Sequence, residues 1–224
     1  MPIVFACIMP NGASGRTRPA LAEVAEELSG ASADVAIVIA AARRPAQAIG
    51  ISSSEDGADI ADLILRAADA EAIPVATQRG DVAVPDAIAG SLSDMARAGI
   101  ATSRLQPRFH FEFGRIAGRV LAEREERAAV ICETGLAADR AGRAFGDRYR
   151  RAIESWDVKW LAGLDPETRR LTGEACVAQT AVLMGALSWC RIQPRVRHYD
   201  ENAGAIVVTI DVLGPRGKAG ARSV

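Results

Sequence analysis

Residues 3–12 read IVFACIMPNG, an apolar run that ends in a Pro-Asn-Gly turn. The unbroken apolar stretch 3–9 predicts a strand that is buried on both faces, as parallel strands are. After a loop, Thr17 can cap a helix whose apolar positions, Leu21 and Leu28 among them, recur at helical spacing. A buried strand followed by an amphipathic helix is the repeating unit of an α/β domain.

The same alternation continues along the chain, which predicts a single layered α/β domain with a mostly parallel central sheet flanked by helices. The further strands are expected at 35–41, 48–52, near Val75, at 128–132, and as a hairpin at 195–199 and 206–212; the helices are expected at 59–72, 85–98, 110–123, 143–156 and 174–189.

Length and composition favour one domain. The 224 residues are 49% apolar and 4% aromatic, enough to bury one large core. We expect residues 1–213 to form this domain and the glycine-rich, basic residues 214–224 to be a frayed tail.

Charge and cysteine usage exclude several classes of protein. The formal net charge of -1 gives no field that would attract nucleic acid or an anionic membrane, and no apolar run reaches the roughly 20 residues that a membrane span needs. Without a signal peptide pattern at the start, a cytoplasmic location is expected. The four cysteines lie far apart in apolar stretches, so we expect buried, reduced thiols.

Histidine, the usual ligand of catalytic iron, is scarce. His110 and His198 are the only two. A facial-triad iron site needs two imidazoles and a carboxylate at one point, and nothing local suggests that these two meet. A structural or surface role is the favoured interpretation for each. A second hypothesis places a nucleophile at Cys132 with Glu133 as its base, because both stand at the end of a predicted strand.

Two strand ends resemble the metal-binding turns of the LigB-like family, which comprises class III extradiol ring-cleavage dioxygenases. Segment 3–12 resembles the first strand of that family, which ends in Pro-His-Gly; Asn11 stands where the first iron-ligating histidine would be. The next strand ends in AAARRP (40–45), where the family has a serine-proline-histidine type of turn. By this resemblance the second histidine is also replaced, by Ala42 or Arg43.

Later segments extend the resemblance over nearly the whole chain. FGRI (113–116) looks like the leucine-glycine-arginine helix of the family. ETGLAA (133–138) is similar to its serine-glycine-aspartate-leucine-serine-histidine segment, which puts Ala138 at the place of the acid/base histidine. LTGEAC (171–176) resembles the segment with the carboxylate ligand, so Glu174 is the one surviving metal-ligand candidate.

The resemblance implies an accessory protein rather than an active enzyme. An extradiol dioxygenase binds its catecholate on Fe(II) and uses a histidine for proton transfer, and both sets of imidazoles are missing here. We therefore expect no cofactor and a non-catalytic subunit, or a binder of a small aromatic or carboxylate compound that contacts Asn11, Arg43 and Arg44. The alternative is an active Fe(II) dioxygenase that recruits His110 or His198.

The resemblance also implies partners. Members of the family assemble as homo-oligomers or with a paralogous dioxygenase chain. Trp156, Trp160 and Leu161 add apolar surface beyond the need of one core, which favours an interface near the carboxyl end.

Overall fold

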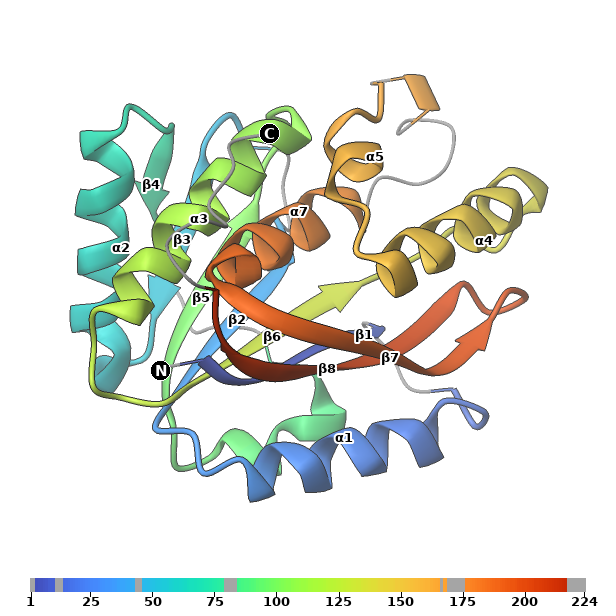
Figure 1. The fold of residues 1–224 in the computed structure, drawn as a ribbon, viewed down its shortest axis with the longest axis horizontal. Coiled ribbons are helices and arrows are strands. Elements are labelled where there is room, and N and C mark those ends of the chain that lie inside the picture. Colours follow the sequence, from blue (N-terminus) through green and yellow to red (C-terminus); the bar gives the residue numbers. More distant parts are fainter. Residues whose placement is uncertain are drawn as a thin grey trace.

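The chain forms an eight-stranded mixed sheet with helices on both faces (Figure 1). This computed structural model describes residues 3–10, 14–42, 46–78, 84–165, 167–168 and 176–216. The strands are β1 (Ile3–Pro10), β2 (Val35–Ala41), β3 (Ile49–Ser53), β4 (Val75–Thr77), β5 (Ala96–Thr102), β6 (Ala128–Thr134), β7 (Cys190–Asp200) and β8 (Ala205–Pro215). The helices are α1 (Arg18–Gly30), α2 (Ala58–Ala70), α3 (Pro107–Ala122), α4 (Arg140–Ser155), α5 (Val158–Ala162) and α7 (Val177–Ala186).

The strand order is β4-β3-β5-β2-β6-β1-β8-β7. The four central strands, β5, β2, β6 and β1, run parallel to one another, while β3 and β8 run antiparallel to their central neighbours. The predicted α/β class with a mostly parallel sheet is therefore confirmed. Strands β7 and β8 form the hairpin expected from the sequence, and it is longer than expected at both ends.

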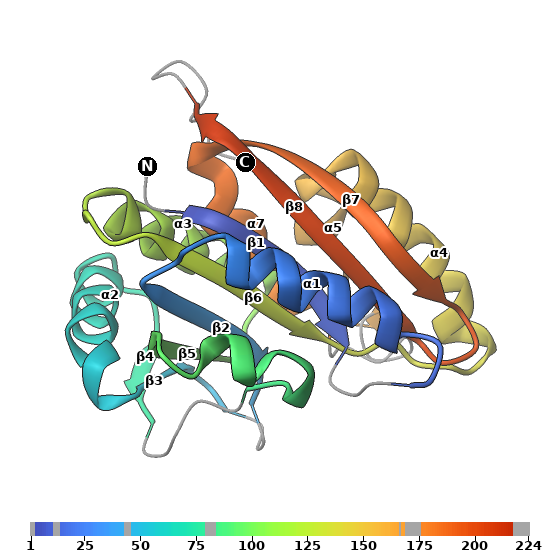
Figure 2. The same ribbon diagram turned by 90° about the horizontal axis from the view of Figure 1, so that it is seen from below.

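Two apolar clusters lie on opposite faces of the sheet, because side chains alternate along each strand. Helix α1 covers one face, and Phe5, Cys7 and Met9 of β1 point to it. The helices α2, α3, α4, α5 and α7 cover the other, where Ala6 and Ile8 of the same strand are buried (Figure 2).

Glycine allows α3 and α7 to pack closely in the larger cluster. A Cβ atom on Gly114 would lie 2.1 Å from the carbonyl oxygen of Val182, and one on Gly118 would lie 2.3 Å from that of Ala186. Residue numbers rise together along this contact, so the two helices run parallel.

The helix predicted at 85–98 is wrong. This stretch forms two short 3-10 turns, Asp86–Ile88 and Gly90–Leu92, and then enters β5, which pairs with β2 along its whole length. Helical apolar spacing concealed the strand, since β5 is made mostly of small residues with weak strand preference. Helix α7 begins at Val177, and residue 174, where it was expected to start, lies outside the described residues. Of the tail expected at 214–224, Gly214 and Pro215 belong to β8, and residues 217–224 lie outside the described residues.

The tryptophans do not form the exposed surface predicted for them. Leu161 is buried, and Trp156 and Trp160 pack against the larger cluster, where the Trp160 ring stacks on Phe145 at a centroid distance of 5.7 Å. The sequence could not show this, because the covering residues come from distant segments. The four cysteines are free and buried, as predicted. Among the described ranges, no helix is long and apolar enough to cross a membrane.

Candidate functional site

The carboxyl ends of the parallel strands meet at one edge of the sheet, where α/β proteins bind ligands. Pro10 of β1 pairs with Thr134 of β6, and Ala41 of β2 pairs with Thr102 of β5. We call this the carboxyl edge. The ligand contacts expected from the resemblance directly follow β1 and β2 in the chain, because Asn11 comes after Pro10, and Arg43 and Arg44 come after Ala42.

Four of the predicted site residues lie outside the described residues: Asn11, Arg43, Arg44 and Glu174. The described residues next to these positions show to which part of the fold each of these segments is joined. Pro10 marks the carboxyl edge, and Cys176, two residues after Glu174, is buried in the larger cluster with Cys132 of β6.

Ala138 lies exposed in the connection from β6 to α4. The next residue, Asp139, caps α4 by accepting a hydrogen bond from the Gly142 N–H at 2.7 Å. The Ala138 carbonyl oxygen accepts a bond from the Arg143 guanidinium at 3.2 Å. A methyl side chain at this position offers no proton donor or acceptor.

A cluster of buried polar side chains lies near the carboxyl edge, on the face of the sheet that α7 covers. The hydroxyl groups of Tyr149 and Thr180 are 2.6 Å apart, and the Thr180 hydroxyl also bonds the thiol of Cys132. Burial raises the pKa of Cys132 and of Tyr149 well above their ordinary values. Both side chains are therefore neutral at physiological pH, and their hydrogen bonds fix α4 and α7 to β6.

Glu133 points to the opposite face of the sheet from Cys132, because the two are adjacent in a strand. It is about half buried, and this burial raises the pKa of its carboxyl group. The geometry does not form the nucleophile and base that the sequence suggested for Cys132 and Glu133, since the thiol is inaccessible, protonated and on the other side of the sheet.

His110 has the structural role favoured from the sequence. It is fully buried at the start of α3. Its Nε2 atom accepts a hydrogen bond from the Ser103 N–H at 3.1 Å, and its Nδ1 atom, 3.2 Å from the Gln106 carbonyl oxygen, donates to that oxygen. Both ring nitrogens are thus engaged by the loop that follows β5, and the ring is neutral.

His198 lies far from His110. It is in β7, opposite Val207, at the edge of the sheet that is distant from β5. His110 is bonded to Ser103, which directly follows β5, and from β5 to β7 there are five strand spacings, which at about 4.8 Å each separate these two strands by on the order of 24 Å. In the part of the chain that the structure describes, no three histidine, cysteine or acidic side chains are grouped so as to hold a metal ion.

Gln179 is a buried polar residue that the sequence did not single out. It lies in the first turn of α7 beside Thr180 and is only 2% exposed. Its side-chain oxygen has no hydrogen-bond partner among the described residues. A glutamine inside an apolar helix could have drawn attention, although only the fold shows that it is buried.

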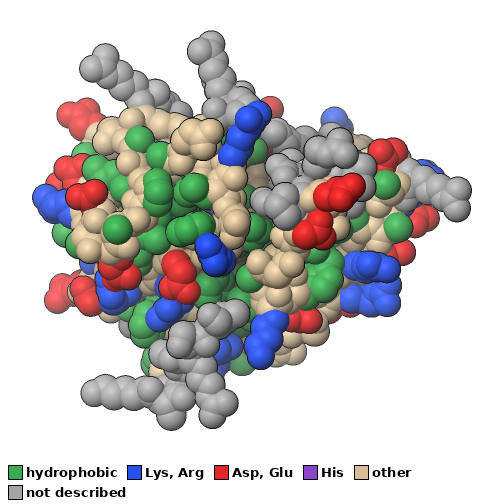
Figure 3. All heavy atoms as spheres, turned by 90° about the horizontal axis from the view of Figure 1, so that it is seen from above, with side chains coloured by type: hydrophobic (Ala, Val, Ile, Leu, Met, Phe, Trp, Pro, Cys, Tyr) green, Lys and Arg blue, Asp and Glu red, His purple; other side chains and the backbone are tan. Residues whose placement is uncertain are grey.

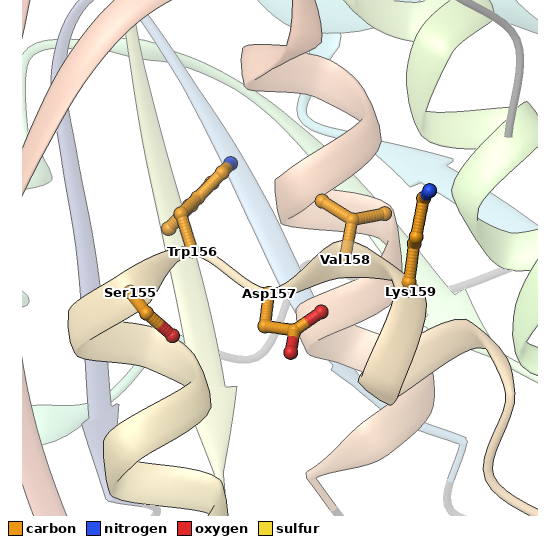
Figure 4. Close-up of a pocket in the computed structure, with 5 residues that line it drawn as sticks. All are labelled: Ser155, Trp156, Asp157, Val158 and Lys159. Atoms are coloured by element: carbon orange, nitrogen blue, oxygen red, sulfur yellow. The ribbon is translucent and has the colours of Figure 1, made fainter.

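A separate hollow of about 430 Å³ lies between α4 and α5 (Figure 4). It is lined by five consecutive residues, Ser155 to Lys159, and is open to solvent. In the close-up, Trp156 and Lys159 point to one side while Asp157 points to the other, where its carboxylate accepts a bond from the Trp160 N–H at 3.0 Å. Since one turn supplies all the lining, this hollow lacks the converging groups of a specific site.

Charge on the face seen in Figure 3 is mixed, with acidic and basic side chains interspersed around hydrophobic ones. This pattern agrees with the net charge of -1, and the described basic side chains on this face form no continuous stripe of the kind that tracks a nucleic acid backbone.

Comparison with known proteins gives a fold and no function. No family model matches the chain, and no curated protein does. Among solved structures, the crystal structure of the uncharacterized protein JW3007 from Escherichia coli K12 is similar, with a TM-score of 0.68 and 13% sequence identity over 93% of this chain and 99% of that one. At this identity the likeness establishes a shared fold alone.

Proposed function

We propose that this chain is a LigB-like protein without a working iron site, which binds a small aromatic or carboxylate compound at the carboxyl edge or serves as a non-catalytic accessory subunit. One observation carries the proposal: the two histidines of the chain lie far apart, His110 at the start of α3 beside the end of β5 and His198 in the edge strand β7. They cannot ligate the same iron, so the two-imidazole site of an extradiol dioxygenase has no source within one chain.

The proposed ligand class follows from the residues after β2. Arg43 and Arg44 follow a buried parallel strand directly, and a guanidinium group binds a carboxylate through two parallel hydrogen bonds. Such a charged contact contributes about 1.5 to 3 kcal/mol. An aromatic carboxylate satisfies both the resemblance and this chemistry.

The iron content of the purified protein tests whether it lacks a working iron site. We expect no stoichiometric iron after anaerobic reconstitution with Fe(II), since Glu174 alone remains of the expected ligands. Restoring the imidazoles with Asn11→His and Ala42→His together should raise metal affinity. Near-equimolar iron in the wild type, lost on Glu174→Ala, would contradict the proposal and support the active dioxygenase.

Calorimetry with 3,4-dihydroxybenzoate tests the binding function. The Arg43→Ala, Arg44→Ala double variant should bind at least tenfold more weakly than the wild type, because it loses a charge-assisted contact. Arg66→Ala, which removes an exposed arginine from α2, is the matched control and should bind like the wild type. Equal, weak binding by all three proteins would rule out the proposed binding of a small aromatic or carboxylate compound.

The accessory role requires a partner chain. Because Trp156 and Trp160 are partly buried against the larger cluster, the prediction of association now rests mainly on the family resemblance. Light scattering at micromolar concentration, alone and with a dioxygenase encoded by an adjacent gene, should give a mass above that of the monomer. A monomeric mass in both experiments would remove the accessory role and leave only the small-molecule binder.

A further inference from the structure

We infer that the outer edge of β7 is built to keep this chain from pairing, strand to strand, with a second copy of itself. The inference does not depend on the function proposed above. It concerns the last strand of the sheet, whose outer side receives no backbone hydrogen bond from any other segment that the structure describes (Figure 2). A long strand of this kind is a template for another strand, so folded proteins protect it.

Strand β7 needs protection because one of its faces is apolar. It spans 11 residues, which alternate along most of its length between exposed and partly buried positions. Ile192 and Val196 are among the partly buried ones, and they pack against the larger cluster. Since these side chains contribute to the core, the strand cannot be polar throughout. Protection has to come from the backbone and from the opposite face.

Pro194 removes a backbone donor from the middle of the outer edge. It pairs with Ile210 of β8, which pairs on its other side with Ala6 of β1. Since proline has no N–H, its backbone takes the orientation that faces away from β8, where no bond of the ladder is lost. Ile192 and Val196 then face outward as well, because the direction alternates along an antiparallel pair. An added strand would find no donor at Pro194, which would leave one of its own carbonyl groups unpaired.

Two irregularities in the register interrupt the pairing with β8 on either side of Pro194. One lies between Arg191 and Ile192, and the other lies between Val196 and His198. Bulges of this kind increase the local twist of a strand pair and bend it. The regular stretch of β7 is therefore 192–196, with proline at its centre.

Arginine side chains occupy the exposed face of the same edge. Arg191, Arg195 and Arg197 are all exposed residues and alternate along the strand. Arg197 reaches α1, where it bonds Glu27, and Arg195 forms an ion pair with Asp211 of β8. Arg191 has no ion pair with any residue that the structure describes. The face next to α1 therefore presents a row of positive charge along the edge.

Pairing with a second copy would bring these arginines together. Two identical edges related by a two-fold axis run antiparallel, and residues opposite each other lie on the same face. A pair centred on Pro194 puts Arg191 opposite Arg197. A pair centred on Gln193 puts Arg191 opposite Arg195. Like charges directly opposite each other destabilise a pair of strands, so the charges and the missing donor oppose the same contact.

The other end of the sheet is protected by its short length. Strand β4, the edge strand there, has only three residues, Val75–Thr77. A strand this short has little free backbone for a partner to bind. Among the described surfaces, the helix-covered faces are then the ones through which copies of this chain can associate.

Thiol crosslinking tests the inference, with Gln193→Cys as the reporter. Gln193 is exposed in the middle of the edge, and the four native cysteines are buried and do not compete. The triple variant Arg191→Thr, Pro194→Thr, Arg195→Thr removes the proline and two arginines and adds residues that favour strands. With a short bismaleimide reagent, the reporter in this triple variant should give about ten times more covalent dimer than the reporter alone.

The matched control is Arg66→Ala, Arg148→Ala in the reporter protein, which removes the same amount of positive charge from exposed positions of α2 and α4. It should crosslink no more than the reporter alone. Equal crosslinking of the reporter alone and of the triple variant would overturn the inference, since the natural edge would then pair already. A triple variant that stays folded by circular dichroism and gives no added dimer would overturn it too.

Two smaller variants keep the test decisive when the triple change prevents folding. Pro194→Thr alone, and Arg191→Thr with Arg195→Thr, change only exposed or partly exposed positions. Each should raise crosslinking by a smaller factor, and no rise in either folded variant overturns the inference. A wild-type mass above that of the monomer, without crosslinking of the Gln193→Cys reporter, puts the contact on another surface and supports it.

Discussion

At the scale of single residues, the buried polar side chains differ in whether their hydrogen-bond partners are near or distant in the sequence. His110 was predicted to be structural, and its two hydrogen bonds confirm this. The pairing of Tyr149 with Thr180 could not be predicted, because the two are separated by 31 positions and meet only when α4 and α7 pack together. The local sequence identifies the polar side chains that could act in a site. Packing between distant segments decides which of them already have hydrogen-bond partners within the protein.

Glu133 gives a prediction for pH. Burial raises the pKa of its carboxyl group above the ordinary value of 4.5, so the folded state holds the proton at pH values where the unfolded chain has released it. The free energy of unfolding contributed by this group therefore falls as the pH rises from about 4.5 through the raised pKa. Glu133→Gln should be more stable than the wild type at pH 7 and equally stable near pH 4.

Urea unfolding at a series of pH values measures this difference. The exposed Glu125→Gln is the control and should leave the free energy of unfolding nearly unchanged across the same range. A stability gap for Glu133→Gln that widens as the pH falls would have the opposite sign to the one expected, and would show that the carboxylate is stabilised in the folded protein.

At the scale of elements, helices and fully buried strands were predictable and small-residue strands were not. Helix α2 and strand β2 carry strong periodic or continuous apolar patterns, and both form close to where they were expected. Strand β5 contains alanine, glycine, arginine and threonine around one isoleucine. Its strand conformation comes from pairing between β2 and β3, which is a property of the sheet and not of the segment.

The contact between α3 and α7 gives a prediction for packing. Gly118→Ala adds a methyl group that would lie 2.3 Å from the Ala186 carbonyl oxygen, so the helices must separate. We expect the free energy of unfolding to fall by about 1 to 3 kcal/mol, although alanine is the better helix former. Gly30→Ala, at the end of α1 with no atom within 4 Å of the added carbon, is the control and should not destabilise the protein. Equal unfolding midpoints for both variants would mean that the contact between α3 and α7 accommodates the added methyl group without strain.

At the scale of the whole molecule, strand order determines what the site can do. The sequence placed Glu133 and Thr134 in a loop directly after the strand 128–132, whereas both are the last residues of β6. It could not show that β5 and β7 lie five spacings apart, because strand order depends on pairing between distant segments. His110 is bonded to Ser103 at the end of β5 and His198 lies in β7, so this separation keeps the two imidazoles from meeting at one metal ion, which no local motif could have decided.

The two apolar clusters should unfold together, because the central strands β1, β2 and β6 contribute side chains to both. Native cysteines report on each face: Cys7 is buried against α1, and Cys132 and Cys176 are buried on the side of α7. Brief labelling with a thiol reagent in increasing urea, followed by mass spectrometry, should give all three one midpoint. A lower midpoint for Cys7 would mean that α1 leaves the sheet while the other face stays folded. Loss of α1 exposes the apolar face of β1, β2 and β6 to water, so a common midpoint is the expected result.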